Sequence, residues 1–137
     1  MGLSLNLFMT FPLLLIWLFQ ILLTPSQTLA RIDNEHLNLA QFAYEQAVEN
    51  GINPAKFLRL VDCESRLNKD AIVDYGASHG ILQFQERTFL KFQKIYGIEG
   101  TWPDPKPEIE LAVKMISNGF WYHWKSCGIR IGLDKDF

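Results

Sequence analysis

The chain has 137 residues, with 13 basic and 15 acidic side chains and a formal charge of −2. This length is enough for one domain and leaves little room for a second. The sequence contains no cluster of basic residues, so we expect no binding to nucleic acid. All charged side chains lie from Arg31 onward, which separates an uncharged N-terminal segment, residues 1–30, from a domain of residues 31–137.

The N-terminal segment contains a largely apolar run, residues 8–23, followed by the small residues Thr28 and Ala30. That order is typical of a secretory signal that is removed near Arg31. The stretch from Leu3 to Leu23 is also nearly long enough to span a bilayer as a retained anchor, which needs about 20 residues. With either a signal peptide or an anchor, we expect the domain to be exported to the periplasm or the extracellular space.

The spacing of apolar residues predicts a helix over residues 33–50, with Asp33 or Asn34 as the N-cap and Gly51 as the terminator. No residue pattern in this helix indicates chemistry, so we expect it to contribute packing only. Its apolar face is expected to comprise Leu37, Ala40, Ala43, Tyr44, Ala47 and Val48.

A second helix is predicted to begin at Asn53-Pro54, where asparagine can cap the first turn and proline leaves no hydrogen bond unmade. This helix should end near residues 66–68, which places Glu64 in its last turn. Burial and the negative end of the helix dipole both disfavour an ionised carboxyl group there. Glu64 is therefore a candidate general acid.

Residues 68–78 show no clear periodicity and are predicted to form a loop, with room for a short β-hairpin within residues 69–82. A further helix is predicted over residues 85–96, with Gly97 as its terminator.

Residues 100–107 are rich in proline and form a connection that no helix could cross. Pro107 is predicted to open the last helix, whose apolar positions continue past Gly119 to Phe120 and Trp121. The sequence therefore predicts a mainly α-helical single domain, which we expect to be a monomer.

Cys63 and Cys127 are the two cysteines of the chain. An even pair in a chain with an export signal indicates a disulfide bond, and two buried free thiols are the alternative. The bond would close a loop of roughly sixty residues, worth about 4 kcal/mol in the chain-entropy model. No His or Cys lies at ligand spacing from either cysteine, so we expect no metal site, and no pattern indicates a cofactor.

A lone carboxyl group that faces a glycine-punctuated loop suits acid catalysis on a sugar chain. Breaking a glycosidic bond requires a proton on the leaving oxygen and stabilisation of positive charge at the anomeric carbon. Most glycosidases use two carboxyl groups for this. Besides Glu64, the candidates for a second carboxylate are Asp70 and Asp74 in the loop that follows.

The order Glu64-Ser65, Gly76-Ala77, Gly80 and Leu82-Gln83 resembles the soluble lytic transglycosylases, which belong to the lysozyme-like superfamily. In that family a Glu-Ser pair carries the catalytic Glu, and a Gly-Ala-x-Gly-Leu-Met-Gln run faces the glycan. The resemblance spans roughly residues 37–124, most of the predicted domain.

The resemblance implies a lysozyme-like fold and cleavage of the β-1,4 bond between N-acetylmuramic acid and N-acetylglucosamine in peptidoglycan. It also implies that Glu64 acts first as acid and then as base, while the sugar's own 6-hydroxyl group closes a 1,6-anhydro ring in place of water. Ser65 and Gln83 would contact the substrate, together with Tyr122, the nearest candidate for the family's substrate-facing tyrosine.

The chain departs from the family pattern in three places. Glu108 stands where the family's Asp-Pro-x-x-Asn-Ile segment has Asn, and the spacer between Ala77 and Gly80 is one residue longer. The usual Ala-Tyr-Asn-Ala-Gly segment is replaced by residues 120–124, an ending more like that of lysozyme-like domains from phage and conjugation systems. Two alternatives stay open: a lysozyme-type hydrolase that uses water, and a non-catalytic glycan-binding component of a secretion or phage assembly.

Overall fold

The computed structural model describes the backbone of residues 25–132, and the side chains of that range from residue 34 onward. The chain divides into two units, Met1–Asn34 and Glu35–Phe137. The apolar run of residues 8–23, predicted to be an export signal or an anchor, lies outside the described residues. Within the described range, no helix has both the length and the apolar character needed to cross a membrane.

Helix α2 spans Pro25–Glu49 and begins earlier than predicted. Asp33 and Asn34 lie inside it rather than at its N-cap, because residues 26–32 contain no glycine or proline to interrupt the helical hydrogen bonds. Gly51 ends the helix as predicted, with a φ of 71°. The Ile52 N–H donates to the Ala47 carbonyl oxygen (2.9 Å), the long hydrogen bond of a Schellman motif.

The buried face of α2 also differs from the predicted one. Leu39, Ala43 and Ala47 are buried, with one helical turn between successive residues. Leu37, Tyr44 and Val48 were expected on the same face but are exposed. The two alanines explain the choice, since their small side chains let the rest of the domain approach the helix closely.

Helix α3 spans Pro54–Ser65, and the Asn53 side chain caps it by accepting a hydrogen bond from the Lys56 N–H (3.1 Å). The helix ends at Arg66, which has a φ of 56° and donates its N–H to the Asp62 carbonyl oxygen. Glu64 therefore lies in the last turn, as predicted. The buried residues of this helix are Phe57, Leu60 and Val61.

The loop after α3 contains the short hairpin that the sequence allowed. Strand β1 (Ile72–Val73) pairs antiparallel with β2 (Ser78–His79), and the 3-10 helix η1 (Asp74–Gly76) joins them. All three residues of η1 have positive φ values, of 53°, 57° and 88°. Two of them are not glycine, and such strained backbone is concentrated at functional sites.

Helix α4 spans Glu86–Tyr96 and ends at Gly97 (φ 65°), as predicted. Helix α5 spans Pro105–Ser117 and so begins two residues before the predicted Pro107. Both prolines fit in its first turn, where no backbone N–H is needed. The helix also stops earlier than predicted, because Gly119 takes a φ of 85° and turns the chain away.

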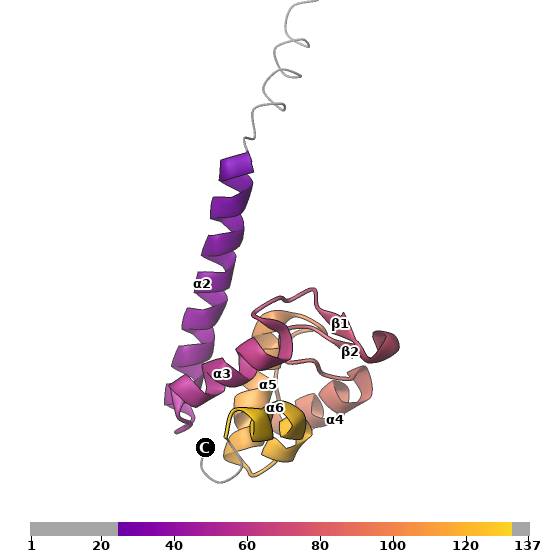
Figure 1. Ribbon diagram of the computed structural model, residues 1–137. Coiled ribbons are helices and arrows are strands. Elements are labelled where there is room, and N and C mark those ends of the chain that lie inside the picture. The colour runs from indigo at the N-terminus through magenta and orange to yellow at the C-terminus, as the bar shows by residue number, and fades with distance from the viewer. Residues whose placement is uncertain (1–24, 133–137) are drawn as a thin grey trace, which may run out of the picture. The chain divides into compact units, whose positions relative to one another are not determined.

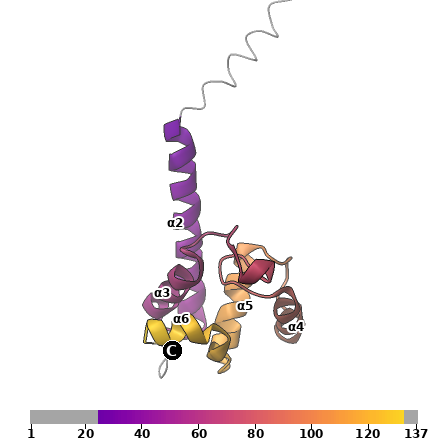
Figure 2. The same cartoon turned by 45° about the vertical axis from the view of Figure 1, so that its right-hand side comes forward.

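The aromatic residues after Gly119 therefore do not extend α5. They begin a second 3-10 helix, η2 (Trp121–Trp124), which leads into α6 (Lys125–Arg130), and neither element was predicted. α5 contacts α4 and η2, and α3 contacts α6 (Figure 1). Figure 2 shows α5 between α4 and the α3–α6 pair. The mainly α-helical class is confirmed.

Helix α5 is buried on nearly every side and includes a fully buried carboxyl group, that of Glu108. Its Oε2 accepts a hydrogen bond from the Leu82 N–H (2.9 Å). Gly80 passes so close that a Cβ atom on it would overlap the carboxyl group. The glycine thus lets the loop of residues 80–83 lie directly on α5.

Gly80→Ala should destabilise the chain more than Gly76→Ala. The φ values of these glycines are 83° and 88°, so alanine carries a similar backbone cost at each, about 1–2 kcal/mol. At Gly80 the new Cβ would also displace the Glu108 carboxyl group, whereas at Gly76 it would meet no atom within 4 Å. Losing the buried hydrogen bond should add about 1–3 kcal/mol. Urea unfolding of both variants measures the difference, and equal losses would contradict this contact.

Candidate active site

The C-terminal end of α3, the hairpin, the loop before α4, and η2 with α6 surround a cavity of about 450 Å³. Two residues predicted to act on or bind substrate, Glu64 and Gln83, line it, and so does Asp74. Ser65, Asp70 and Tyr122 are not among the lining residues. The full lining comprises Glu64, Val73, Asp74, Ser78, Gln83, Phe84, Gln85, Thr88, His123, Trp124, Lys125 and Ser126.

The Glu64 carboxyl group is partly buried at the wall of this cavity. Burial raises its pKa from 4.5 to about 7; Arg130 opposes this rise and Asp74 adds to it. Within the described part of the chain, the carboxyl group forms no hydrogen bond that would hold its proton. Glu64 is therefore present in both protonation states near neutral pH, as a group that donates and then accepts a proton must be.

Asp74 is the second carboxylate at the cavity. The Ser78 hydroxyl group donates a hydrogen bond to Asp74 Oδ2 (2.8 Å), which ties the side chain across the hairpin. Asp70, the other predicted candidate, is exposed and pairs with Lys69 (3.3 Å). The structure thus brings one of the two loop aspartates to Glu64 and leaves the other outside the cavity.

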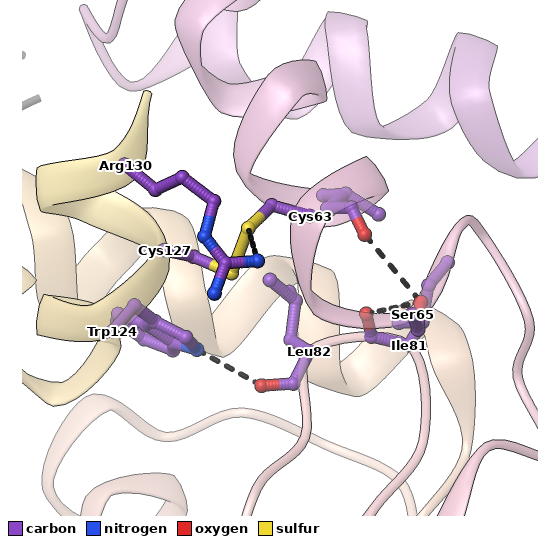
Figure 3. The surroundings of a disulfide bond; sticks show 8 residues. Cys63, Ser65, Ile81, Leu82, Trp124, Cys127 and Arg130 are labelled. Atoms are coloured by element: carbon purple, nitrogen blue, oxygen red, sulfur yellow. Dashed lines mark hydrogen bonds between the residues drawn. A yellow bond between two sulfur atoms is a disulfide. The ribbon is translucent and has the colours of Figure 1, made fainter. Parts of the chain in front are cut away.

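Ser65 and Gln83 both hydrogen bond to the protein backbone. The Ser65 hydroxyl group donates to the Ile81 carbonyl oxygen (2.7 Å), which joins the end of α3 to the loop (Figure 3). Gln83 Nε2 donates to the carbonyl oxygens of Gly80 (2.7 Å) and Ala71 (3.1 Å). Within the described residues Gln83 Oε1 is buried without a partner. Direct contact of either residue with a substrate stays a prediction.

The predicted disulfide bond between Cys63 and Cys127 is confirmed, with an S–S distance of 2.08 Å. It links the residue before Glu64 to α6 (Figure 3). Nearby, Trp124 Nε1 donates to the Leu82 carbonyl oxygen (2.9 Å), so η2 is also tied to the loop. A disulfide bond is compatible with the predicted export of the chain.

Tyr122 is exposed, and its ring stacks on that of His123 at a centroid distance of 4.9 Å. His123 itself lines the cavity, with Phe92 against its ring at 5.3 Å. Burial and the positive charge of Lys91 lower the pKa of His123, which favours the neutral imidazole. Nothing in the sequence separates this histidine from the aromatic residues around it, so its place at the cavity was not predicted.

Glu108 is a second residue whose role was not predicted. Burial raises its pKa to about 8. Hydrogen bonds from the backbone N–H groups of Leu82 and Ile81 lower the pKa, and the negative charge of Asp104 raises it further. A protonated carboxyl group has a hydrogen-bond donor on one oxygen and an acceptor on the other, and so resembles a side-chain amide, which has both a donor and an acceptor.

No protein-family model matches this chain, and no curated protein or solved structure shows a significant match to it. The resemblance to lytic transglycosylases therefore depends on the motif residues alone. Across the described range, no group of three or more His, Cys, Asp or Glu side chains is arranged to hold a metal ion.

Glu108→Gln should change how stability depends on pH. The pKa of Glu108 is about 8 in the folded chain and 4.5 ordinarily, so between these values the folded chain keeps a proton that the unfolded chain has lost. The free energy of unfolding should therefore fall as pH rises through this window, by at most about 1.4 kcal/mol per pH unit from this group. Glutamine cannot ionise, so this contribution disappears.

Urea unfolding of both chains at several pH values between about 5 and 8 measures the effect. Glu64 contributes in the same direction in both chains and cancels in the comparison. Glu99→Gln, at an exposed carboxyl group outside the cavity, controls for the loss of one charge. If Glu108→Gln and the native chain lose stability with the same slope, Glu108 is not a buried acid.

Proposed function

We propose that this chain cleaves the glycan strands of peptidoglycan between N-acetylmuramic acid and N-acetylglucosamine, as a lytic transglycosylase with a lysozyme-like fold. The observation that carries the proposal is the Glu64 carboxyl group, partly buried at a cavity of about 450 Å³ with a pKa of about 7. A helical domain with a small hairpin beside the cavity is compatible with that fold.

In the first step, protonated Glu64 gives its proton to the glycosidic oxygen. The bond from this oxygen to the anomeric carbon breaks, the N-acetylglucosamine side leaves as an alcohol, and positive charge develops on the muramoyl ring. The Asp74 carboxylate, held on the cavity wall by Ser78, supplies negative charge that stabilises this state.

In the second step, the Glu64 carboxylate takes the proton of the muramoyl 6-hydroxyl group. The hydroxyl oxygen bonds to the anomeric carbon and closes the 1,6-anhydro ring. Glu64 ends the cycle protonated, as it began. One carboxyl group with a pKa near neutral pH is sufficient for both steps. When Glu64 gives up its proton in the first step it becomes the carboxylate, which is the base that the second step needs.

The cavity lining suits an N-acetylated sugar with polar substituents. Gln83 and Ser126 offer polar groups, Phe84 offers an apolar surface, and Lys125 offers a positive charge. The cavity volume of about 450 Å³ is within the range of small-ligand sites.

A second candidate function is hydrolysis by water, and the position of Asp74 favours it. Two carboxyl groups at one cavity are the usual equipment of a glycoside hydrolase, with one as acid and the other as base or nucleophile. Glu64 and Asp74 both line this cavity, and each sits on a different element. The two functions differ in their product, which decides between them.

Mass spectrometry of peptidoglycan sacculi incubated with the chain tests both candidates. Muropeptides that end in 1,6-anhydro-muramic acid are expected from a lytic transglycosylase, and reducing ends from a hydrolase. Sacculi that stay intact over the whole range of pH and enzyme concentration would contradict both and favour a glycan-binding protein.

Glu64→Gln should lower turnover by about 10²–10⁴-fold or more, since glutamine can neither donate nor accept the proton. Folding should be retained, because burial disfavours the charge that the substitution removes. Asp70→Asn removes an exposed carboxylate outside the cavity and is the matched control, expected to stay close to native activity. Turnover of Glu64→Gln within a few-fold of native would eliminate Glu64 as the acid.

Arg130→Gln and Asp74→Asn should shift the alkaline side of the pH–rate profile in opposite directions. Since the first step needs protonated Glu64, kcat/KM should fall as pH rises through about 7, the pKa of this group. Arg130 lowers that pKa and Asp74 raises it. Arg130→Gln should therefore move the fall in rate to higher pH, and Asp74→Asn to lower pH.

Both shifts should shrink at high ionic strength, because salt screens charges near the surface. Shifts in the same direction would contradict the proposed control of Glu64 by these two charges. Collapse of turnover in Asp74→Asn at every pH would instead identify the two-carboxylate hydrolase.

A further inference from the structure

A second cavity, of about 310 Å³, shares no lining residue with the candidate active site. It is lined by Arg59, Asp62, Cys63, Arg66, Arg130 and Ile131. Three of the five arginines of the chain meet here, although the whole chain has a net charge of −2. With Asp62 included, the lining carries a net charge of +2.

Two elements bring these arginines together. Arg59 lies on α3, and Arg66 is the residue that caps the C-terminal end of this helix, and both line the cavity. Arg130 comes from α6, which the Cys63–Cys127 disulfide bond ties to α3. Arg130 Nη1 lies 4.0 Å from Cys63 Sγ, and its guanidinium group is directed at the disulfide bond (Figure 3). The separation of the arginines along the chain hides this cluster from a reading of the sequence.

Among the described residues, no carboxylate forms an ion pair with these guanidinium groups. In the part of the chain that the structure describes, the ion pairs are those of Lys69 with Glu35 and with Asp70. Asp62 lines the same cavity without pairing with any of the three arginines. Like charges gathered at one cavity repel each other, and a bound anion relieves that repulsion.

We propose that this cavity is a binding site for an oxyanion with two or more negative charges, carried by phosphate or carboxylate groups. Guanidinium groups present planar, forked donors that match both kinds of anion, and they keep their charge at any physiological pH. A volume of about 310 Å³ leaves room for more than one such group. Arg130 also lowers the pKa of Glu64, but the proposed anion site does not depend on glycan cleavage.

Isothermal titration calorimetry of the full chain at low ionic strength tests the proposal, with pyrophosphate as the phosphate probe and citrate as the carboxylate probe. We expect saturable binding of at least one probe. Arg59→Gln and Arg130→Gln should each raise its Kd about tenfold or more, the effect of one lost charge-assisted hydrogen bond. The probe that binds more tightly identifies which chemistry the site prefers.

Arg87→Gln is the matched control, because this exposed arginine of α4 does not line the cavity and its loss changes the net charge equally. Its Kd should stay native. Glu64→Gln should not weaken binding of the probe, because it removes a negative charge that interacts with Arg130, and this separates the site from the candidate active site. Arg59→Lys and Arg130→Lys keep the charge but lose the fork, and they should bind with intermediate affinity. If circular dichroism shows that a glutamine variant does not fold, these two lysine variants test the proposal in its place.

Three results would overturn the proposal. The first is that neither probe binds at concentrations up to about 10 mM, because an interaction weaker than this does not define a specific site. The second is an unchanged Kd in the folded Arg59 and Arg130 variants. The third is an equal loss of affinity in Arg87→Gln, which would reduce the effect to net charge.

Discussion

Three side chains from three different elements hold the backbone of two residues, Ile81 and Leu82. Glu108 of α5 accepts the Leu82 N–H, Trp124 of η2 donates to the Leu82 carbonyl oxygen, and Ser65 of α3 donates to the Ile81 carbonyl oxygen. Both residues are themselves fully buried, so these polar groups have no access to bulk water and require protein partners. The next residues along the chain, Gln83 and Phe84, line the candidate active site. The hydrogen bonds to Ile81 and Leu82 therefore fix the position of this part of the cavity wall.

Burial is the main cause of the raised pKa of both Glu64 and Glu108, but the surroundings of the two carboxyl groups differ. Glu64 opens on a cavity, and charges of both signs, Arg130 and Asp74, act on it. Glu108 is fully buried under the loop at Gly80 and accepts a hydrogen bond from the Leu82 N–H. A carboxyl group at a cavity can exchange its proton with whatever enters, whereas an enclosed one holds its proton as part of the structure. Geometry, and not the pKa, separates the candidate catalytic acid from the structural acid.

Local signals in the sequence predicted the elements whose ends are set locally. Asn53 caps α3, and Gly51 and Gly97 end the helices before them, because capping depends on residues within one turn. The motif also placed Glu64 and Gln83 at one cavity. The positions of Glu108, His123 and the three clustered arginines could not be read in this way, since each depends on contacts between segments far apart in the sequence. The prediction of the buried face of α2 was wrong for the same reason. Apolar residues lie on more than one face of this helix, and packing against other elements decides which face is buried.

The disulfide bond also sets an order of events for a chain that is synthesised from its N-terminus. Glu64 emerges early, with α3, while Trp124 and Cys127 come from the last elements that the structure describes. Until those elements dock, the carboxyl group lacks the part of the cavity wall that Trp124, Lys125 and Ser126 supply. A nascent chain that has not yet folded would thus carry an ordinary, ionised glutamate at this position. Docking of the last elements therefore changes this residue from an ordinary glutamate into a carboxyl group with a raised pKa.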